Sequence, residues 1–159
     1  MSTDASLRIL FVCMGNICRS PAAEAVMQSK VAEAGLSHWI ECDSAGTIDY
    51  HTGQLSDQRM RAAASKRGYE LTSRARQVQV SDLTDFDHIL TMDAQNYQEV
   101  LKLDPQGRHR EKIRAFCDYV PQQDVMEVPD PYYGGQQGFD DVLDLLEAGC
   151  DQFLSELTR

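Results

Sequence analysis

Apolar runs and amphipathic segments alternate along the chain, and their periods predict strands and helices in turn. A nearly continuous apolar run at residues 7–12 predicts a buried strand, because it is rich in Ile, Leu, Phe and Val and too short for a helix. The predicted strands span residues 7–12, 39–45, 86–92 and 112–116. Apolar residues three or four positions apart predict helices at residues 19–35, 56–66, 94–103 and 139–157. We expect Arg19 or Ser20 to cap the first helix, with Pro21 in its first turn.

Strands that alternate with helices are typical of a parallel sheet with helices on both faces. The sequence therefore predicts a three-layer α/β fold, built as a single domain over residues 1–159, with residues 1–6 flexible. Ligands of such sheets bind beyond the carboxyl ends of the strands. Cys13 follows the first predicted strand directly, so it stands at such an end.

The acidic composition narrows the choice of partners. The chain has 25 Asp and Glu residues against 15 Lys and Arg residues, which gives a net charge of −10. A nucleic acid or an anionic membrane surface would be repelled, so neither is expected as a partner. No segment approaches the ~20 apolar residues of a membrane span, and no signal peptide is recognisable. We expect a cytoplasmic protein that is a monomer.

The five cysteines are odd in number and scattered, which is typical of reduced thiols in a cytosolic protein. A zinc site at Cys13 and Cys18 would need further ligands at recognisable spacing. The four histidines are dispersed along the chain. We therefore expect neither a metal nor another cofactor.

The loop between the first strand and the first helix has the composition of a phosphate-binding loop. Successive backbone N–H groups between Cys13 and Arg19 can point inward, and the following helix adds the positive end of its dipole. Gly15 and Asn16 tolerate backbone angles that other residues resist. Arg19 offers a planar fork that matches two phosphate oxygens.

Cys13 is the candidate nucleophile of this loop. A thiol at a helix N-terminus beside an arginine is expected to hold its sulfur as a thiolate, and Ser20 can donate a hydrogen bond to that sulfur. The alternative is a small apolar residue buried at a strand end. The surrounding Gly15, Asn16 and Ser20 favour the functional interpretation, because all the local signals agree.

Cys18 lies on the same curled loop as Cys13, so a disulfide between them is geometrically plausible. Such a bond would protect the nucleophile from over-oxidation. A second function hypothesis is therefore a redox-sensing module that binds phosphate groups without turnover. Cys18 can equally be a buried residue with a packing role.

Asp130 is the candidate proton donor for a leaving group. Pro129 and Pro131 restrict the backbone on both sides of it, and a carboxyl beside a bound dianion is expected to stay protonated long enough to donate. A surface turn would have a similar composition. Tyr132 and Tyr133 either pack together or form the wall of an aromatic slot.

These residues resemble the low-molecular-weight protein tyrosine phosphatase family over essentially the whole chain. The resemblance rests on residues 12–21, 43–47 and 130–134, and the segments 75–77 and 92–96 also fit. It implies a four-stranded parallel sheet flanked by helices. It also implies Cys13 as nucleophile, Arg19 as the clamp on the transition state, and Asp130 as general acid and then base.

The resemblance assigns further residues to the site by their place in these motifs. The phosphate-binding loop comprises Met14, Gly15, Asn16, Ile17, Cys18 and Ser20. Support for the loop is assigned to Ser44, Asp93 and Asn96, and the aromatic rim to Tyr50, Tyr132 and Tyr133. Many eukaryotic members have a histidine in the supporting network at the position of Ser73, so this part of the network departs from the family pattern.

The resemblance implies hydrolysis of phosphotyrosine in tyrosine-phosphorylated proteins, without a metal. A tyrosine kinase that phosphorylates Tyr132 or Tyr133 is a further candidate partner. Two relatives share the loop and remain alternatives. Arginine-phosphate phosphatases tend to have a threonine in place of Ile17, and arsenate reductases need further cysteines near residues 80–90, where this chain has none.

Overall fold

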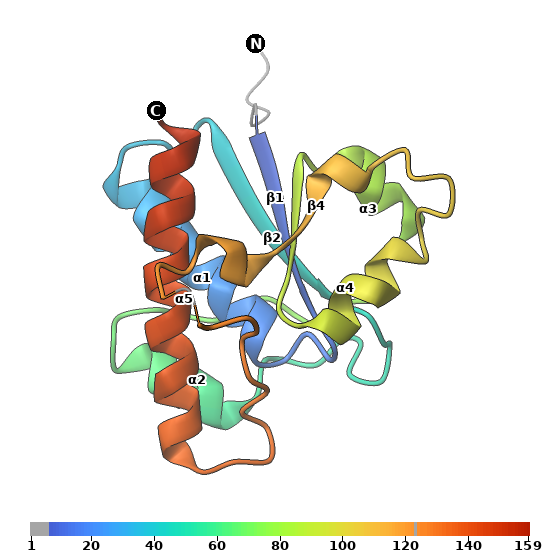
Figure 1. Cartoon of the computed structure of the whole chain (residues 1–159). Coiled ribbons are helices and arrows are strands. Elements are labelled where there is room, and N and C mark those ends of the chain that lie inside the picture. The colour runs from blue at the N-terminus through green and yellow to red at the C-terminus, as the bar shows by residue number, and fades with distance from the viewer. Residues whose placement is uncertain (1–6, 123) are drawn as a thin grey trace.

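The computed structural model describes residues 7–122 and 124–159, and it forms a three-layer α/β fold (Figure 1). The strands are β1 (Leu7–Cys13), β2 (Ile40–Gly46), β3 (His88–Thr91) and β4 (Ile113–Ala115). The α-helices are α1 (Arg19–Glu33), α2 (Gln58–Ser65), α3 (Val80–Asp85), α4 (Ala94–Leu101) and α5 (Gln136–Leu157). Two 3₁₀ helices, η1 (Arg110–Lys112) and η2 (Phe116–Tyr119), flank β4.

The four strands form one parallel sheet in the order β2-β1-β3-β4, which confirms the predicted fold class. In this register Cys13 pairs with Gly46 of β2, and Val12 pairs with Thr91 of β3. The loops that follow β1, β2 and β3 therefore meet at one edge of the sheet. This edge is the place where ligands of open parallel sheets bind.

Two apolar clusters hold the helices on the two faces of the sheet. Side chains alternate along β1, so Ile9, Phe11 and Cys13 contribute to one cluster and Leu10 and Val12 to the other. The first cluster lies under α1, α2 and α5, and the second lies under α3 and α4 (Figure 1). All five of these β1 residues are buried, which explains why the segment reads as an unbroken apolar run.

Every strand and helix expected from the sequence is present, with ends that differ by a few residues. Helix α3 was not predicted, nor were η1 and η2, and the predicted strand at 112–116 is shorter because its two end residues belong to η1 and η2. The expected flexibility of residues 1–6 concerns residues outside the described part of the chain.

The expectation that Arg19 or Ser20 caps α1 is wrong. The helix begins at Arg19, the residue before it is Cys18, and no side chain caps the first turn. The Ser20 hydroxyl points instead to the Cys13 sulfur and the Ala45 carbonyl. The N–H groups of Arg19 and Ser20 have no partners within the helix, so a ligand can bind them, whereas the Ala22 N–H donates to the Cys18 carbonyl at 3.2 Å.

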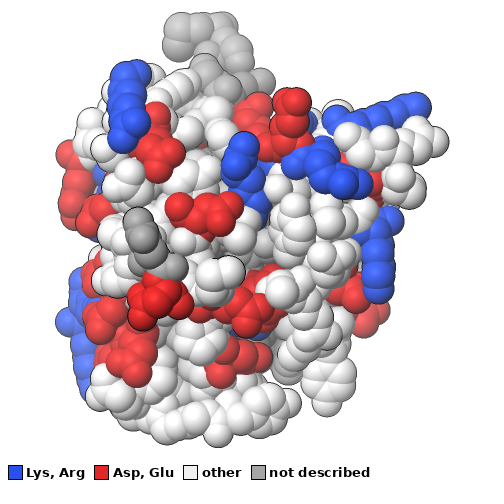
Figure 2. Space-filling view, in the orientation of Figure 1, with Lys and Arg blue, Asp and Glu red and all other residues white. Residues whose placement is uncertain are grey.

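Charged side chains of both signs are interspersed over the face shown in Figure 2. Among the residues of the described ranges, no helix has both the length and the apolar character to cross a membrane.

Candidate active site

The Cys13 sulfur lies at the bottom of the loop that joins β1 to α1. Its residue is 2% exposed, and its Sγ is 3.0 Å from the Ser20 hydroxyl. The backbone N–H of Asn16 donates to the same sulfur at 3.3 Å. The Ser20 hydroxyl and the Asn16 N–H are thus both placed to donate hydrogen bonds to this sulfur.

Asn16 holds the loop in its curled shape. Its backbone has a φ of 57°, the left-handed conformation expected from the sequence. Its side-chain amide donates to the hydroxyls of Ser20 at 2.8 Å and Ser44 at 3.0 Å, and its Oδ1 accepts from the backbone N–H of Arg76 at 3.0 Å. One side chain therefore connects the loop to the helix that follows it, to β2 and to the segment after Ser73.

Gly46, which follows the second predicted strand and belongs to the motif at residues 43–47, lies against the backbone of the loop. A Cβ at this position would come within 2.7 Å of the Met14 carbonyl oxygen. The residues that follow it complete the contact, because Thr47 N–H donates to the Cys13 carbonyl and Ile48 N–H to the Met14 carbonyl. A side chain at position 46 would displace the loop.

A half-buried carboxylate, Glu24, extends this network away from the sulfur. The Ser44 hydroxyl donates to Glu24 Oε1 at 2.6 Å. Burial raises the pKa of Glu24, and hydrogen bonds from Ser44 and Ser73 oppose the shift. Ser73, the position that departs from the family pattern, thus faces the network through Glu24, which the sequence analysis had not singled out.

Arg19 is almost completely buried beside the loop and is held by two carboxylates. Its Nη1 donates to Asp93 Oδ2 at 2.6 Å and to the Val128 carbonyl at 3.1 Å, while Nη2 lies 3.6 Å from Asp130 Oδ2. Burial alone would lower the pKa of Arg19, but Cys13 and the two carboxylates raise it. The guanidinium is therefore a fixed, permanently charged group.

Asp93 binds Arg19 from the start of α4, and Asn96 lies in the first turn of that helix. Asp93 caps α4, because its Oδ1 accepts from the backbone N–H of Asn96 at 2.8 Å. The Asn96 side chain is buried, and its Oδ1 has no partner among the described residues. Asp93 thus supports the loop through Arg19, whereas Asn96 contributes its backbone.

Asp130 comes from a long irregular segment before α5. Its Oδ1 accepts from the backbone N–H of Tyr132 at 3.1 Å, and its side chain is 33% exposed. A proline stands on each side of Asp130 in the sequence. The Asp130 carboxyl lies beside Arg19 and lines the same cavity as Cys13.

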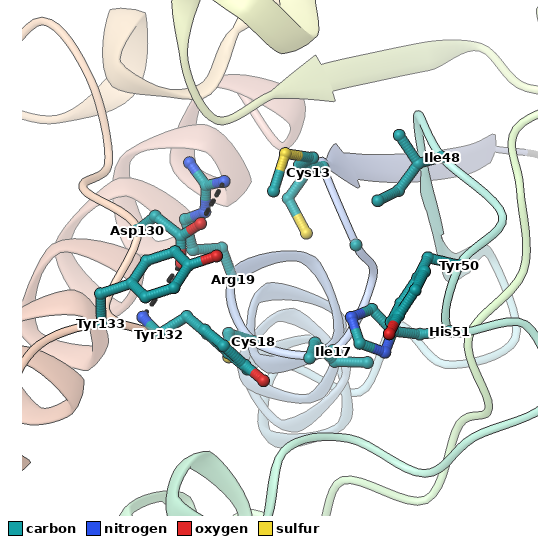
Figure 3. Close-up of a pocket in the computed structure, with 12 residues that line it drawn as sticks. Cys13, Ile17, Cys18, Arg19, Ile48, Tyr50, His51, Asp130, Tyr132 and Tyr133 are labelled. Carbon is teal, nitrogen blue, oxygen red and sulfur yellow. Dashed lines mark hydrogen bonds and ion pairs between the residues drawn. The ribbon is translucent and has the colours of Figure 1, made fainter.

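These groups surround a cavity of about 300 Å³ (Figure 3). Tyr132 and Tyr133 form one wall, and Tyr50 and His51 form the opposite wall, with Cys13 between them. Tyr50 and Tyr133 are 78% and 86% exposed, so the cavity opens to solvent between aromatic rings.

Two residues of this cavity, Ile48 and His51, were missed by the sequence analysis. His51 Nδ1 is 3.0 Å from Gln54 Oε1, and the ring packs against Gly15. Their position in the segment after the β2 motif is the signal that could have found them, since the predicted rim residue Tyr50 is their neighbour.

The five cysteines are all free and buried, including Cys13 and Cys18. Burial raises the pKa of the Cys18 thiol, and the nearby Asp57 carboxylate raises it further. Cys18 therefore stays a neutral thiol. Within the described ranges, no group of His, Cys, Asp and Glu side chains could hold a metal ion.

A thiol at the end of a parallel strand, an anion-binding loop and a buried arginine together are typical of phosphatases that use a cysteine nucleophile. Residues 8–159 match the family model described as low molecular weight phosphotyrosine protein phosphatase. The chain belongs to this family of metal-independent hydrolases.

Curated relatives and solved structures agree with this assignment. A low molecular weight protein-tyrosine-phosphatase from Streptomyces coelicolor is 42% identical over 150 residues, covering 93% of this chain and 92% of the relative. The human low molecular weight phosphotyrosine protein phosphatase is 35% identical, covering 98% and 99%. A crystal structure of a protein tyrosine phosphatase from Entamoeba histolytica superposes with a TM-score of 0.93 at 46% identity, covering 96% and 97%.

Proposed function

We propose that this protein hydrolyses phosphotyrosine in proteins through a cysteinyl-phosphate intermediate formed on Cys13. In the first step the Cys13 thiolate attacks phosphorus, so that the S–P bond forms as the bond between phosphorus and the tyrosine oxygen breaks. Asp130 gives its proton to that oxygen, and tyrosine leaves as a neutral phenol. The observation that carries the proposal is the convergence of Cys13, Arg19 and Asp130 on one cavity.

In the second step a water molecule releases the phosphate. Asp130, now ionised, accepts a proton from the water while the water oxygen bonds to phosphorus. The S–P bond breaks at the same time and regenerates the thiolate. The Ser20 hydroxyl, 3.0 Å from the sulfur, stabilises the departing thiolate. One carboxyl thus acts as acid and then as base.

Both steps build up charge on the three oxygens that remain bound to phosphorus. We propose that the backbone N–H groups from Met14 to Ser20, the N-terminus of α1 and the Arg19 guanidinium bind these oxygens. Catalysis of phosphoryl transfer depends mainly on such positioning and on electrostatic stabilisation. No metal is needed, because these groups supply the positive field.

The aromatic walls support a phosphotyrosine substrate over the alternatives. Tyr50, Tyr132 and Tyr133 frame the cavity, and aromatic rings prefer other rings as partners. An arginine phosphate would gain less from these walls. A single chain contains the whole site, so we propose that a monomer is sufficient. Because Cys13 must stay reduced, we propose a cytoplasmic location.

A tyrosine kinase is a second proposed partner, as expected from the sequence. Of the adjacent tyrosines Tyr133 is 86% exposed and Tyr132 is 37% exposed, so Tyr133 is the more accessible acceptor.

The experiment that tests the proposed function is a phosphate-release assay with a chelator present. Phosphotyrosine, phosphoserine and phosphoarginine peptides are compared, with arsenate reduction run in parallel. We expect turnover of phosphotyrosine, its complete loss in Cys13→Ser, and retained binding of inorganic phosphate by that variant. Asp130→Ala should slow poor leaving groups far more than good ones. Substantial activity in Cys13→Ser would exclude the covalent route.

A further inference from the structure

Arg59 is an arginine of α2 that contacts the aromatic wall of the cavity from outside. Its guanidinium carbon lies 5.2 Å from the centre of the Tyr132 ring and 4.9 Å from the centre of the Phe139 ring. Phe139 is fully buried in the core, whereas Tyr132 lines the cavity. The guanidinium therefore joins a rigid ring of α5 to a ring of the substrate site.

Asp57 fixes the position of this guanidinium. Its carboxylate accepts from Arg59 Nε at 3.2 Å and from Nη2 at 3.0 Å, a fork-to-fork pair with a defined plane. The backbone N–H of Asp57 donates to the Ile17 carbonyl at 2.8 Å. Arg59 is thus connected to the phosphate-binding loop at one end and to the aromatic wall at the other.

The aromatic wall needs such support because the described residues of segment 124–135 form no helix or strand. Tyr132 is additionally held by its neighbour Tyr133, whose ring centre is 5.0 Å away, and by its own N–H bond to Asp130. Tyr133 is itself largely exposed, so it restrains Tyr132 weakly. Arg59 supplies the contact to a fixed part of the molecule.

We infer that Arg59 is a positioning residue that holds Tyr132 for stacking against the ring of phosphotyrosine. The inference rests on the proposed function and deepens it, because it explains how a phosphotyrosine ring is selected. Arg59 acts through Tyr132, since it does not itself belong to the described residues that line the cavity. Its charge is also paired with Asp57, which leaves it unsuited to binding the phosphate.

The test separates ring binding from phosphate binding in Arg59→Gln. The KM for a phosphotyrosine peptide reports on both, whereas competitive inhibition by inorganic phosphate reports on the loop alone. We expect the KM to rise about threefold to tenfold, the range of a lost cation–π contact, while the Ki of phosphate is unchanged. Arg61→Gln is the matched control: it removes the same charge from the same helix, where Arg61 Nε binds the Ser56 carbonyl.

A double-mutant cycle with Tyr132→Ala tests whether the effect passes through the ring. If Arg59 acts through Tyr132, Arg59→Gln adds nothing to the KM of Tyr132→Ala. Equal effects of Arg59→Gln in both backgrounds, or a parallel rise in the Ki of phosphate, would overturn the inference while leaving the proposed function intact. If the unaltered protein failed to hydrolyse the peptide, both would be wrong.

Discussion

At the residue scale, the side chains of the site divide by how far apart they lie in the sequence. Cys13, Asn16, Arg19 and Ser20 lie on one short segment that runs from the end of β1 into the first turn of α1. Their mutual geometry therefore follows from local backbone rules, and the sequence predicted them together. Arg59 reaches the site only through tertiary packing. No local sequence pattern identifies Arg59 as part of the site, because arginines are common on the exposed faces of helices.

The network behind the loop shows the same division. Ser44 was predicted from its motif, but its partner Glu24 belongs to α1 and looks like an ordinary helix carboxylate in the sequence. Its role depends on burial, which only the packing of α1 against β2 creates. A half-buried carboxyl that accepts a hydrogen bond from Ser44 makes stability depend on pH.

The first prediction concerns this pH dependence. The pKa of Glu24 is raised above its ordinary value of 4.5, with burial as the main cause, so the folded state binds the proton more tightly than the unfolded chain. The contribution of Glu24 to the free energy of unfolding is therefore fully present below its ordinary pKa. It is lost as the pH rises through the raised pKa of the folded state. Relative to Glu24→Gln, the free energy of unfolding of the unaltered protein should fall over this window.

Urea unfolding of both proteins at a series of pH values measures this difference, in which the effects of carboxylates that do not interact with Glu24 cancel. Glu70→Gln, at an exposed position, controls for the loss of one negative charge. A difference that rises with pH would contradict the direction of the pKa shift.

At the element scale, the strength of the apolar pattern decides what the sequence can predict. The buried strand β1 and the long helix α5 have many apolar residues at the spacing expected of a strand and a helix, and both were predicted. Helix α3 has few, and its Val80 is 62% exposed. Asp82 holds it, by accepting from the Gln79 N–H at 2.7 Å and from Arg76 at 3.0 Å. A helix of six residues is too short for an apolar period to show, so the capping pair of Gln79 and Asp82 is the local signal that could have revealed it.

The second prediction concerns the packing of α5 against η2. Gly149 lies inside α5, and a Cβ there would overlap the ring of Phe116. Phe116 cannot move away, because it is fully buried and packs against Phe11 in an edge-on arrangement, with 6.3 Å between the two ring centres. Gly149→Ala should therefore destabilise the protein by about 1–3 kcal/mol in thermal or urea unfolding, although alanine favours helices.

Gly138 in the first turn of the same helix gives a matched control. A Cβ there would lie 3.7 Å from the Pro131 Cβ, an ordinary contact distance. Gly138→Ala should stabilise the helix by up to about 1 kcal/mol. The same loss of stability in both variants would mean that close packing on Phe116 is not the cause.

At the scale of the whole molecule, the groups that bind an anion are local to the site, whereas the net charge of the chain is negative. The chain as a whole carries a net charge of −10, whereas the proposed binding groups of the cavity are Arg19 and backbone N–H groups. Figure 2 shows that acidic side chains are spread among basic ones on one face. The approach of an anionic substrate is thus opposed at long range and favoured only on contact. Composition alone predicted the long-range repulsion, whereas the attraction on contact could be recognised only from the fold.

The third prediction follows from this distribution of charge. Fields reach about 30 Å at 0.01 M salt but only about 8 Å at 0.15 M salt. For a phosphotyrosine peptide flanked by glutamates, kcat/KM should rise roughly twofold to fivefold over this range, because screening removes repulsion from the net charge. A peptide with lysines at the same positions should show the opposite trend. If the two peptides instead shared one salt dependence, salt would be acting inside the cavity on Arg19 and the phosphate, and the long-range field would have no part in substrate capture.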